Sequence, residues 1–166
     1  LGLSLIPPVL REGLAEIEAA EQDLLPCLAQ PEDLKGIFHL HTNYSDGINS
    51  LDEMVEAAIA QGYQYMGITD HSSAAVYARG LSRERVSQQW EEIERLNKKH
   101  HNFTIFKGIE ADILPSGELD YDPEFLKQFD FVIGAVHSRF GMGKEEMTAR
   151  LLRAMNHPAL TILGHP

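Results

Sequence analysis

From Gly36 onward, short apolar runs alternate with longer stretches in which apolar residues recur at helical spacing. The apolar runs predict strands at 36–40, 65–69, 103–109, 131–136 and 160–163. The intervening periodicity predicts helices that start near Ser50 and near Ser82, a short one over 122–129, and one around Met147 to Met155. Strands that alternate with helices are typical of βα units joined into a parallel sheet. We therefore predict an α/β fold with about five βα units.

The first 32 residues differ from this pattern. A Pro7-Pro8 pair precedes apolar positions that recur at helical spacing between Val9 and Asp23, which predicts an amphipathic helix. Pro26 and Pro31 then interrupt the chain. We interpret residues 1–32 as a leader or linker segment, followed by one domain at residues 33–166.

Composition narrows the class of protein. A chain of 166 residues with 43% hydrophobic and 23% charged residues is the size and make-up of one globular domain. Cys27 is the lone cysteine, so no intramolecular disulfide is possible, and no signal peptide or membrane span is evident. We expect a cytoplasmic protein. The formal net charge of −11 argues against a broad basic surface for nucleic acid.

Each expected strand is followed by a side chain that can bind a metal. In chain order these are His39 and His41, Asp70 and His71, Glu110, His137, and His165. In an extended chain alternate side chains face the same way, so the first two histidines should point together, and Asp46 follows them after a short turn. Because the carboxyl ends of parallel strands meet at one rim, we expect a multinuclear metal site there.

The kinds of ligand indicate the chemistry. Imidazoles and carboxylates without a thiolate suit zinc, manganese or iron, and the sequence does not choose among them. Glu110 is our candidate for a carboxylate that bridges two ions, with His137 beside it, whereas Asp70 either binds metal or orients a metal-bound imidazole. Two ions ~3.5–4 Å apart favour phosphate ester hydrolysis. Arg139, two residues after His137, and Arg79 are candidates for binding the substrate phosphate.

Five short motifs together resemble one known family. In order they are His39-Leu40-His41-Thr42 with Ser45-Asp46-Gly47, Ile68-Thr69-Asp70-His71-Ser72, Gly108-Ile109-Glu110, Ala135-Val136-His137-Ser138 and Gly164-His165-Pro166. They resemble the PHP (polymerase and histidinol phosphatase) domain. The Leu5-Ile6-Pro7-Pro8 and Ile113-Leu114-Pro115 segments are similar to the branch found at the C-terminus of bacterial and archaeal family X DNA polymerases.

This resemblance implies a distorted seven-stranded βα barrel with a trinuclear metal site. It assigns His39, His41 and Glu110 to one ion, His137 and His165 with the same glutamate to a second, and Asp46 with His71 to a third. It implies manganese-dependent 3′–5′ exonuclease and abasic-site activity on DNA in base-excision repair. In other relatives it implies hydrolysis of histidinol phosphate.

One departure keeps other functions open. The family usually completes its site with a late Asp-x-His motif, which does not occur in these 166 residues. We therefore expect an incomplete barrel whose uncovered strand edges favour association with another chain, and weak or no activity for this segment alone. A small-molecule phosphatase, mildly favoured by the acidic charge, and an inactive structural PHP module are the alternatives.

Overall fold

The chain divides into two compact units, Leu1–Leu34 and Lys35–Pro166. The structure, a computed structural model, describes residues 2–165. The second unit begins two residues after the predicted start of the domain. That the first unit acts as a leader or linker stays a prediction. Across the described residues, no helix combines the length and apolar character needed to cross a membrane.

The first unit contains three short helical segments. They are the 3₁₀ turn η1 (Pro8–Leu10), the helix α1 (Glu16–Glu21) and the 3₁₀ turn η2 (Pro31–Asp33). The prediction of one amphipathic helix from Val9 to Asp23 is wrong in its extent. Gly13 and Ala15 have φ angles of 74° and 73°, in the left-handed region, and this conformation separates η1 from α1.

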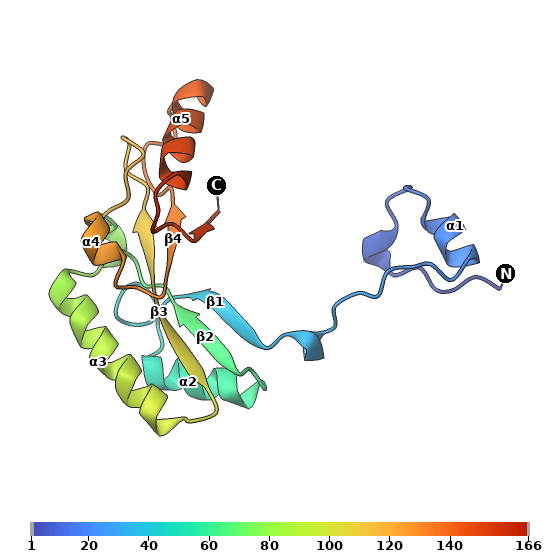
Figure 1. Ribbon diagram of the computed structural model, residues 1–166, viewed down its shortest axis with the longest axis horizontal. Helices are drawn as coiled ribbons and strands as arrows, with labels where there is room; N and C mark the ends of the chain where they lie inside the picture. The colour runs from blue at the N-terminus through green and yellow to red at the C-terminus, as the bar shows by residue number, and fades with distance from the viewer. Residues whose placement is uncertain (1, 166) are drawn as a thin grey trace. The chain divides into compact units, whose positions relative to one another are not determined.

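The second unit is built around five parallel strands in the order β1-β2-β3-β4-β5 (Figure 1). The strands are β1 (Gly36–Leu40), β2 (Tyr65–Ile68), β3 (Thr104–Asp112), β4 (Phe131–Ala135) and β5 (Ile162–Leu163). The helical segments between them are α2 (Leu51–Ala60), η3 (Val76–Ala78), α3 (Arg83–Lys99), α4 (Pro123–Leu126) and α5 (Lys144–Met155). The predicted α/β fold of about five βα units is confirmed.

Side-chain caps set the starts of three helices. Ser50 and Glu53 form a reciprocal capping box at α2, Ser82 accepts from the Arg85 amide at α3, and Asp122 caps α4. Each cap satisfies an amide that has no partner inside the helix. The loops from the strands into these helices therefore end at defined residues.

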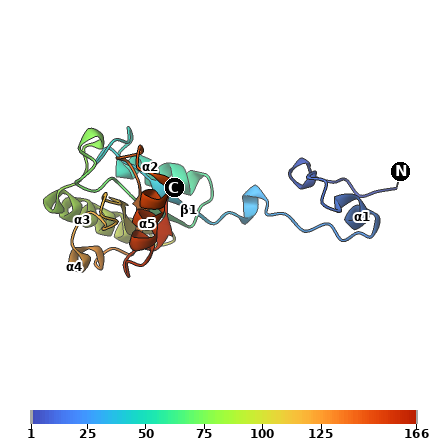
Figure 2. The same ribbon diagram turned by 90° about the horizontal axis from the view of Figure 1, so that it is seen from above.

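The outer face of the sheet is covered by helices. Helices α2 and α3 pack together against β2 and β3 (Figures 1 and 2). An ion pair of 2.6 Å joins Asp52 of α2 to Arg95 of α3. A second core lies where α3, α4 and α5 meet β3 and β4, and includes Val86, Ile109, Val132 and Ala154. These two cores fix the positions of the strand ends.

The inner face carries aromatic rings toward one end of the sheet and acids toward the other. Phe38 and Phe131 meet edge to face with ring centroids 5.0 Å apart. A Cβ on Gly67 would collide with the first ring and one on Gly108 with the second, so both positions require glycine. Side chains alternate along a strand, so Glu110 lies on the same face as Gly108, further along β3.

Strand β3 differs from its predicted form. We expected it to end before Glu110, whereas it continues to Asp112. Strand β1 is an edge strand, and Phe38 is 39% exposed. Within residues 2–165, β1 and β5 pair on one side each. Association of another chain with these edges stays a prediction.

Candidate metal centre

Five histidines surround the Glu110 carboxylate, which is 1% exposed. The Oε1 atom lies 3.0 Å from Nε2 of His39, 3.3 Å from Nε2 of His137 and 3.0 Å from Nε2 of His165. The Oε2 atom lies 3.4 Å from Nε2 of His41 and 3.1 Å from Nδ1 of His71. The structure thus brings together histidines from residues 39 to 165 around one carboxylate.

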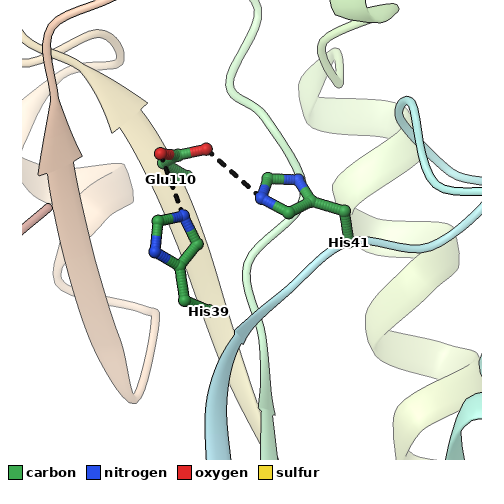
Figure 3. Close-up of side chains that lie close together, drawn as sticks. All are labelled: His39, His41 and Glu110. Carbon is green, nitrogen blue, oxygen red and sulfur yellow. Dashed lines mark ion pairs between the residues drawn. The ribbon is translucent and has the colours of Figure 1, made fainter. Parts of the chain in front are cut away.

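His39 and His41 reach this carboxylate through an irregular backbone. His39 has a φ angle of 64°, and the pairing of β1 with β2 shifts register between Ile37 and Leu40. The expectation of a plain extended chain at this point is therefore wrong, because a left-handed residue interrupts the strand. Even so, both imidazoles face Glu110, one toward each oxygen (Figure 3).

Asp46 lies on the side of the cluster that is open to solvent. Its side chain is 48% exposed, and its two oxygens each lie 3.5 Å from an imidazole nitrogen, one on His41 and one on His71. A carboxylate and two imidazoles at this spacing form a second set of possible ligands. The turn after β1 thus contributes both an imidazole and an acid.

Within residues 2–165, three groups of side chains have ligand atoms within 4.8 Å of one another. They are His39, His41 and Glu110; His41, Asp46 and His71; and His71, Glu110 and His137. The first group has the composition that the family resemblance implies for one ion. The third group differs from the set that the resemblance implies for a second ion, because it contains His71 in place of His165. His165 still lies close to Oε1 of Glu110, the oxygen that His137 also approaches.

Several buried atoms at the centre lie near an oppositely charged group but make no hydrogen bond. Among the described residues, these include Nδ1 of His41, Nδ1 of His71 and Oε2 of Glu110. A buried polar atom without a hydrogen bond is costly, and here each is a metal ligand of a common type. The arrangement therefore fits divalent cations, which would satisfy these atoms together.

The pKa values of two histidines at the centre shift in opposite directions. Burial lowers the pKa of His41, and the neighbouring His71 lowers it further, which favours the neutral form of the imidazole, the form that can bind metal. The hydrogen bond to Asp112, together with that to Glu110, raises the pKa of His137 to about 9. Burial would raise the pKa of Glu110, but bonding to His137 and the adjacent imidazole charges outweigh burial and lower it to about 2.

Asp112 is a site residue that sequence reasoning missed. Its Oδ1 atom lies 2.8 Å from Nδ1 of His137, and the side chain is buried. A carboxylate on Nδ1 fixes the ring so that Nε2 faces Glu110, as metal-bound histidines commonly require. The signal was available, because Asp112 is two residues after Glu110 and faces the same side of a strand.

Asp70 makes its contacts outside the three ligand groups, and its role toward metal stays a prediction. Its carboxylate is fully buried and accepts hydrogen bonds from the amides and hydroxyls of Thr42 and Ser45, and from the Gln89 side chain. These donors occupy it, and it belongs to none of the three ligand groups. Asp70 therefore anchors the turn that carries His41 and Asp46.

The two candidate phosphate-binding arginines lie at the surface. Arg139 lines an open depression of about 510 Å³ together with Pro115, Gly141, Met142 and Glu146. Arg79 lies in the loop after η3, where its carbonyl accepts a hydrogen bond from Arg85. In the described part of the chain, neither belongs to the ion pairs around Glu110. Their role toward substrate stays a prediction.

Two known proteins are similar to this chain in sequence. The chain is 44% identical over 165 residues to the DNA polymerase/3′-5′ exonuclease PolX of Bacillus subtilis, a match that covers 99% of this chain and 29% of that protein. A probable phosphatase of Acetivibrio thermocellus is 30% identical over 132 residues, with 77% of this chain and 52% of that protein covered. The chain thus spans about half or less of these relatives.

A solved structure shows the same fold. Histidinol phosphate phosphatase of Lactococcus lactis, in complex with zinc, L-histidinol and phosphate, superposes with a TM-score of 0.54 and 21% sequence identity. The superposition covers 79% of this chain and 57% of that one, so the five strands correspond to part of its fold. The model of the PHP domain matches residues 38–162 of this sequence. The chain belongs to the PHP domain family.

Proposed function

We propose that this chain is a metal-dependent phosphoesterase that acts on the 3′ ends or abasic sites of DNA during repair in the cytoplasm. The observation that carries the proposal is the Glu110 carboxylate, whose two oxygens face five imidazoles, with several buried ligand atoms among them that make no hydrogen bond. The similarity to a polymerase and exonuclease along 99% of the chain favours DNA as the substrate.

We propose that two or three manganese, zinc or iron ions bind at the centre. The ligands would be His39, His41, Asp46, His71, Glu110, His137 and His165. When bound, such ions lower the pKa of a coordinated water and stabilise the negative charge of a phosphate ester in hydrolysis.

The protein's own groups prepare the centre for this chemistry. Glu110 is ionised at neutral pH, so both of its oxygens are available as metal ligands, and it is our candidate bridge between ions. Asp112 holds the ring of His137 in one orientation, and Asp70 holds the turn that carries His41. We propose that Arg139 and Arg79, both exposed, bind phosphate groups of the substrate.

A small phosphate monoester is the second candidate substrate. The probable phosphatase relatives and the acidic net charge of −11 favour it, because an acidic surface repels the DNA backbone. A structural role without catalysis is the third candidate. Substrate preference and metal content together distinguish all three.

The test compares Glu110→Ala and His137→Ala with the unchanged full-length protein. We expect manganese-dependent shortening of a 5′-labelled oligonucleotide, at least 100-fold slower in both variants, together with loss of bound metal in elemental analysis. His101→Ala is the matched control, because this histidine is exposed at the end of α3. Turnover of histidinol phosphate but not DNA would favour the second candidate, and fewer than two ions per chain without turnover would favour the third.

A further inference from the structure

Tyr77 lies beside the metal centre and is 69% exposed. It belongs to η3, in the loop between β2 and α3. Its ring centroid is 6.1 Å from that of His71 and 6.3 Å from that of His137. Both imidazoles belong to the ligand group that they form with Glu110. A phosphate held at this group would therefore have the Tyr77 ring next to it.

The loop around Tyr77 is held firmly in place. Ala75 and Ala78, on either side of it, are buried, and the Asp120 carboxylate accepts hydrogen bonds from the Ser73 hydroxyl and the Ala74 amide. A Cβ on Gly80 would collide with the carbonyl of Ser72, so the chain packs closely against itself there. The exposure of Tyr77 thus belongs to an ordered loop and not to a frayed segment.

A fixed, exposed aromatic ring suits a flat ligand. Aromatic side chains at such positions stack on nucleobases, and each stacked base contributes roughly 1–3 kcal/mol, which is about fivefold to 150-fold in affinity. A nucleotide presents its phosphate and its base to different parts of a site. Here the ligand group that contains His71 and His137 can receive the phosphate, and the Tyr77 ring can receive the base.

We propose that Tyr77 is a stacking platform for the base of the 3′-terminal nucleotide of a DNA substrate. This inference rests on the proposed function and makes it more specific. It assigns recognition to the face of the ring, not to the phenol hydroxyl. The phenol is neutral at physiological pH, because burial and the charges of Asp112 and Glu110 raise its pKa.

The kinetic test uses two oligonucleotides with the full-length, manganese-loaded protein. One ends in an ordinary 3′ nucleotide, and the other carries tetrahydrofuran in place of the terminal base. We expect Tyr77→Ala and Tyr77→Leu to lower kcat/KM about fivefold or more on the first substrate and less than twofold on the second. Tyr77→Phe and Tyr77→Trp should keep the preference for a terminal base, since both retain a ring.

A binding measurement tests stacking without turnover. A 3′-terminal 2-aminopurine joined by a phosphorothioate linkage should lose fluorescence on binding to the unchanged protein, and much less on binding to Tyr77→Ala. Val76→Ala is the control, because Val76 is 81% exposed in the same turn. We expect it to behave as the unchanged protein.

The outcomes separate the two proposals. If the unchanged protein degrades DNA and Tyr77→Ala affects both oligonucleotides equally, or neither, stacking is refuted and the proposed function stands. If the unchanged protein degrades no DNA, the proposed function fails, and the fluorescence measurement alone decides whether Tyr77 binds a base. Loss of the preference in Tyr77→Phe would show that the hydroxyl acts instead, which also refutes stacking.

Discussion

Replacing Asp112 by Asn tests how the centre orients its ligands. The change keeps the size of this buried side chain but removes the charge that faces Nδ1 of His137 at 2.8 Å. A hydrogen bond to a charged group is worth about 1.5–3 kcal/mol, and each 1.4 kcal/mol is a factor of ten. We therefore expect Asp112→Asn to weaken metal binding about 10-fold to 100-fold, the range typical of partners to metal-bound histidines.

Two measurements check this prediction. Competition with a chelator of known affinity gives the metal dissociation constant of each variant. In the metal-free protein, NMR titration should show a lower pKa for His137, because the Asp112 hydrogen bond is the largest cause of its raised value of about 9. Activity at saturating metal should recover more than activity at limiting metal, since the change acts on binding.

Asp52→Asn serves as the control, because Asp52, on helix α2, pairs with Arg95 of α3 instead of with an imidazole. It should leave the metal affinity unchanged. An Asp112→Asn protein that remains folded, with metal affinity within twofold of the unchanged protein, would refute the role we assign to Asp112.

Three further predictions follow from other contacts. Asp70→Ala leaves buried donors on Thr42, Ser45 and Gln89 without an acceptor. It should lower the free energy of unfolding, measured in urea, by about 3 kcal/mol, and a loss below about 1 kcal/mol would contradict this. Arg150→Met removes a buried guanidinium that donates hydrogen bonds to the carbonyls of Ile113, Leu114 and Ser138. It should lower the free energy of unfolding by about 2–3 kcal/mol in the same assay. An unchanged midpoint of urea unfolding would show that water replaces these bonds. Metal competes with the proton on His137, whose pKa is about 9, so metal affinity should rise about tenfold per pH unit from pH 7 to pH 9 and then level off; a flat profile in calorimetry would contradict this.

The sheet and the convergence of its ligands could be predicted because their signals are local. An apolar run in the sequence indicates a strand, and apolar residues at helical spacing indicate a helix. Parallel topology then brings the ends of the strands together. The strand prediction at 36–40 agrees with β1 for this reason. The same reasoning predicted that His39, His137 and Glu110 lie together at one rim of the sheet, and in the structure both imidazoles lie close to the Glu110 carboxylate.

What could not be predicted depends on backbone conformation or on distant partners. The left-handed residue at His39 leaves no trace in a pattern of apolar and polar residues. The same holds for left-handed Ala15, directly after which α1 begins, later than the expected start of the N-terminal helix at Val9. Asp70 reads as a ligand because it follows a strand. Its donors lie 19 to 28 residues away in the sequence, and only the fold reveals them.

The charges at the centre explain why it should hold cations. Glu110 is buried and ionised, because bonding to His137 and the adjacent imidazole charges lower its pKa. In the absence of metal, a proton on His137, whose pKa is raised first by Asp112 and then by Glu110, supplies positive charge beside it. A metal ion that binds between them must displace this proton, because only a neutral imidazole is a ligand. The proton and the ion therefore compensate the same buried carboxylate, and a centre that held neither would leave a charge buried without a partner. For this reason we expect Glu110→Gln, which removes the charge but keeps the shape, to lower the His137 pKa and to abolish tight metal binding together.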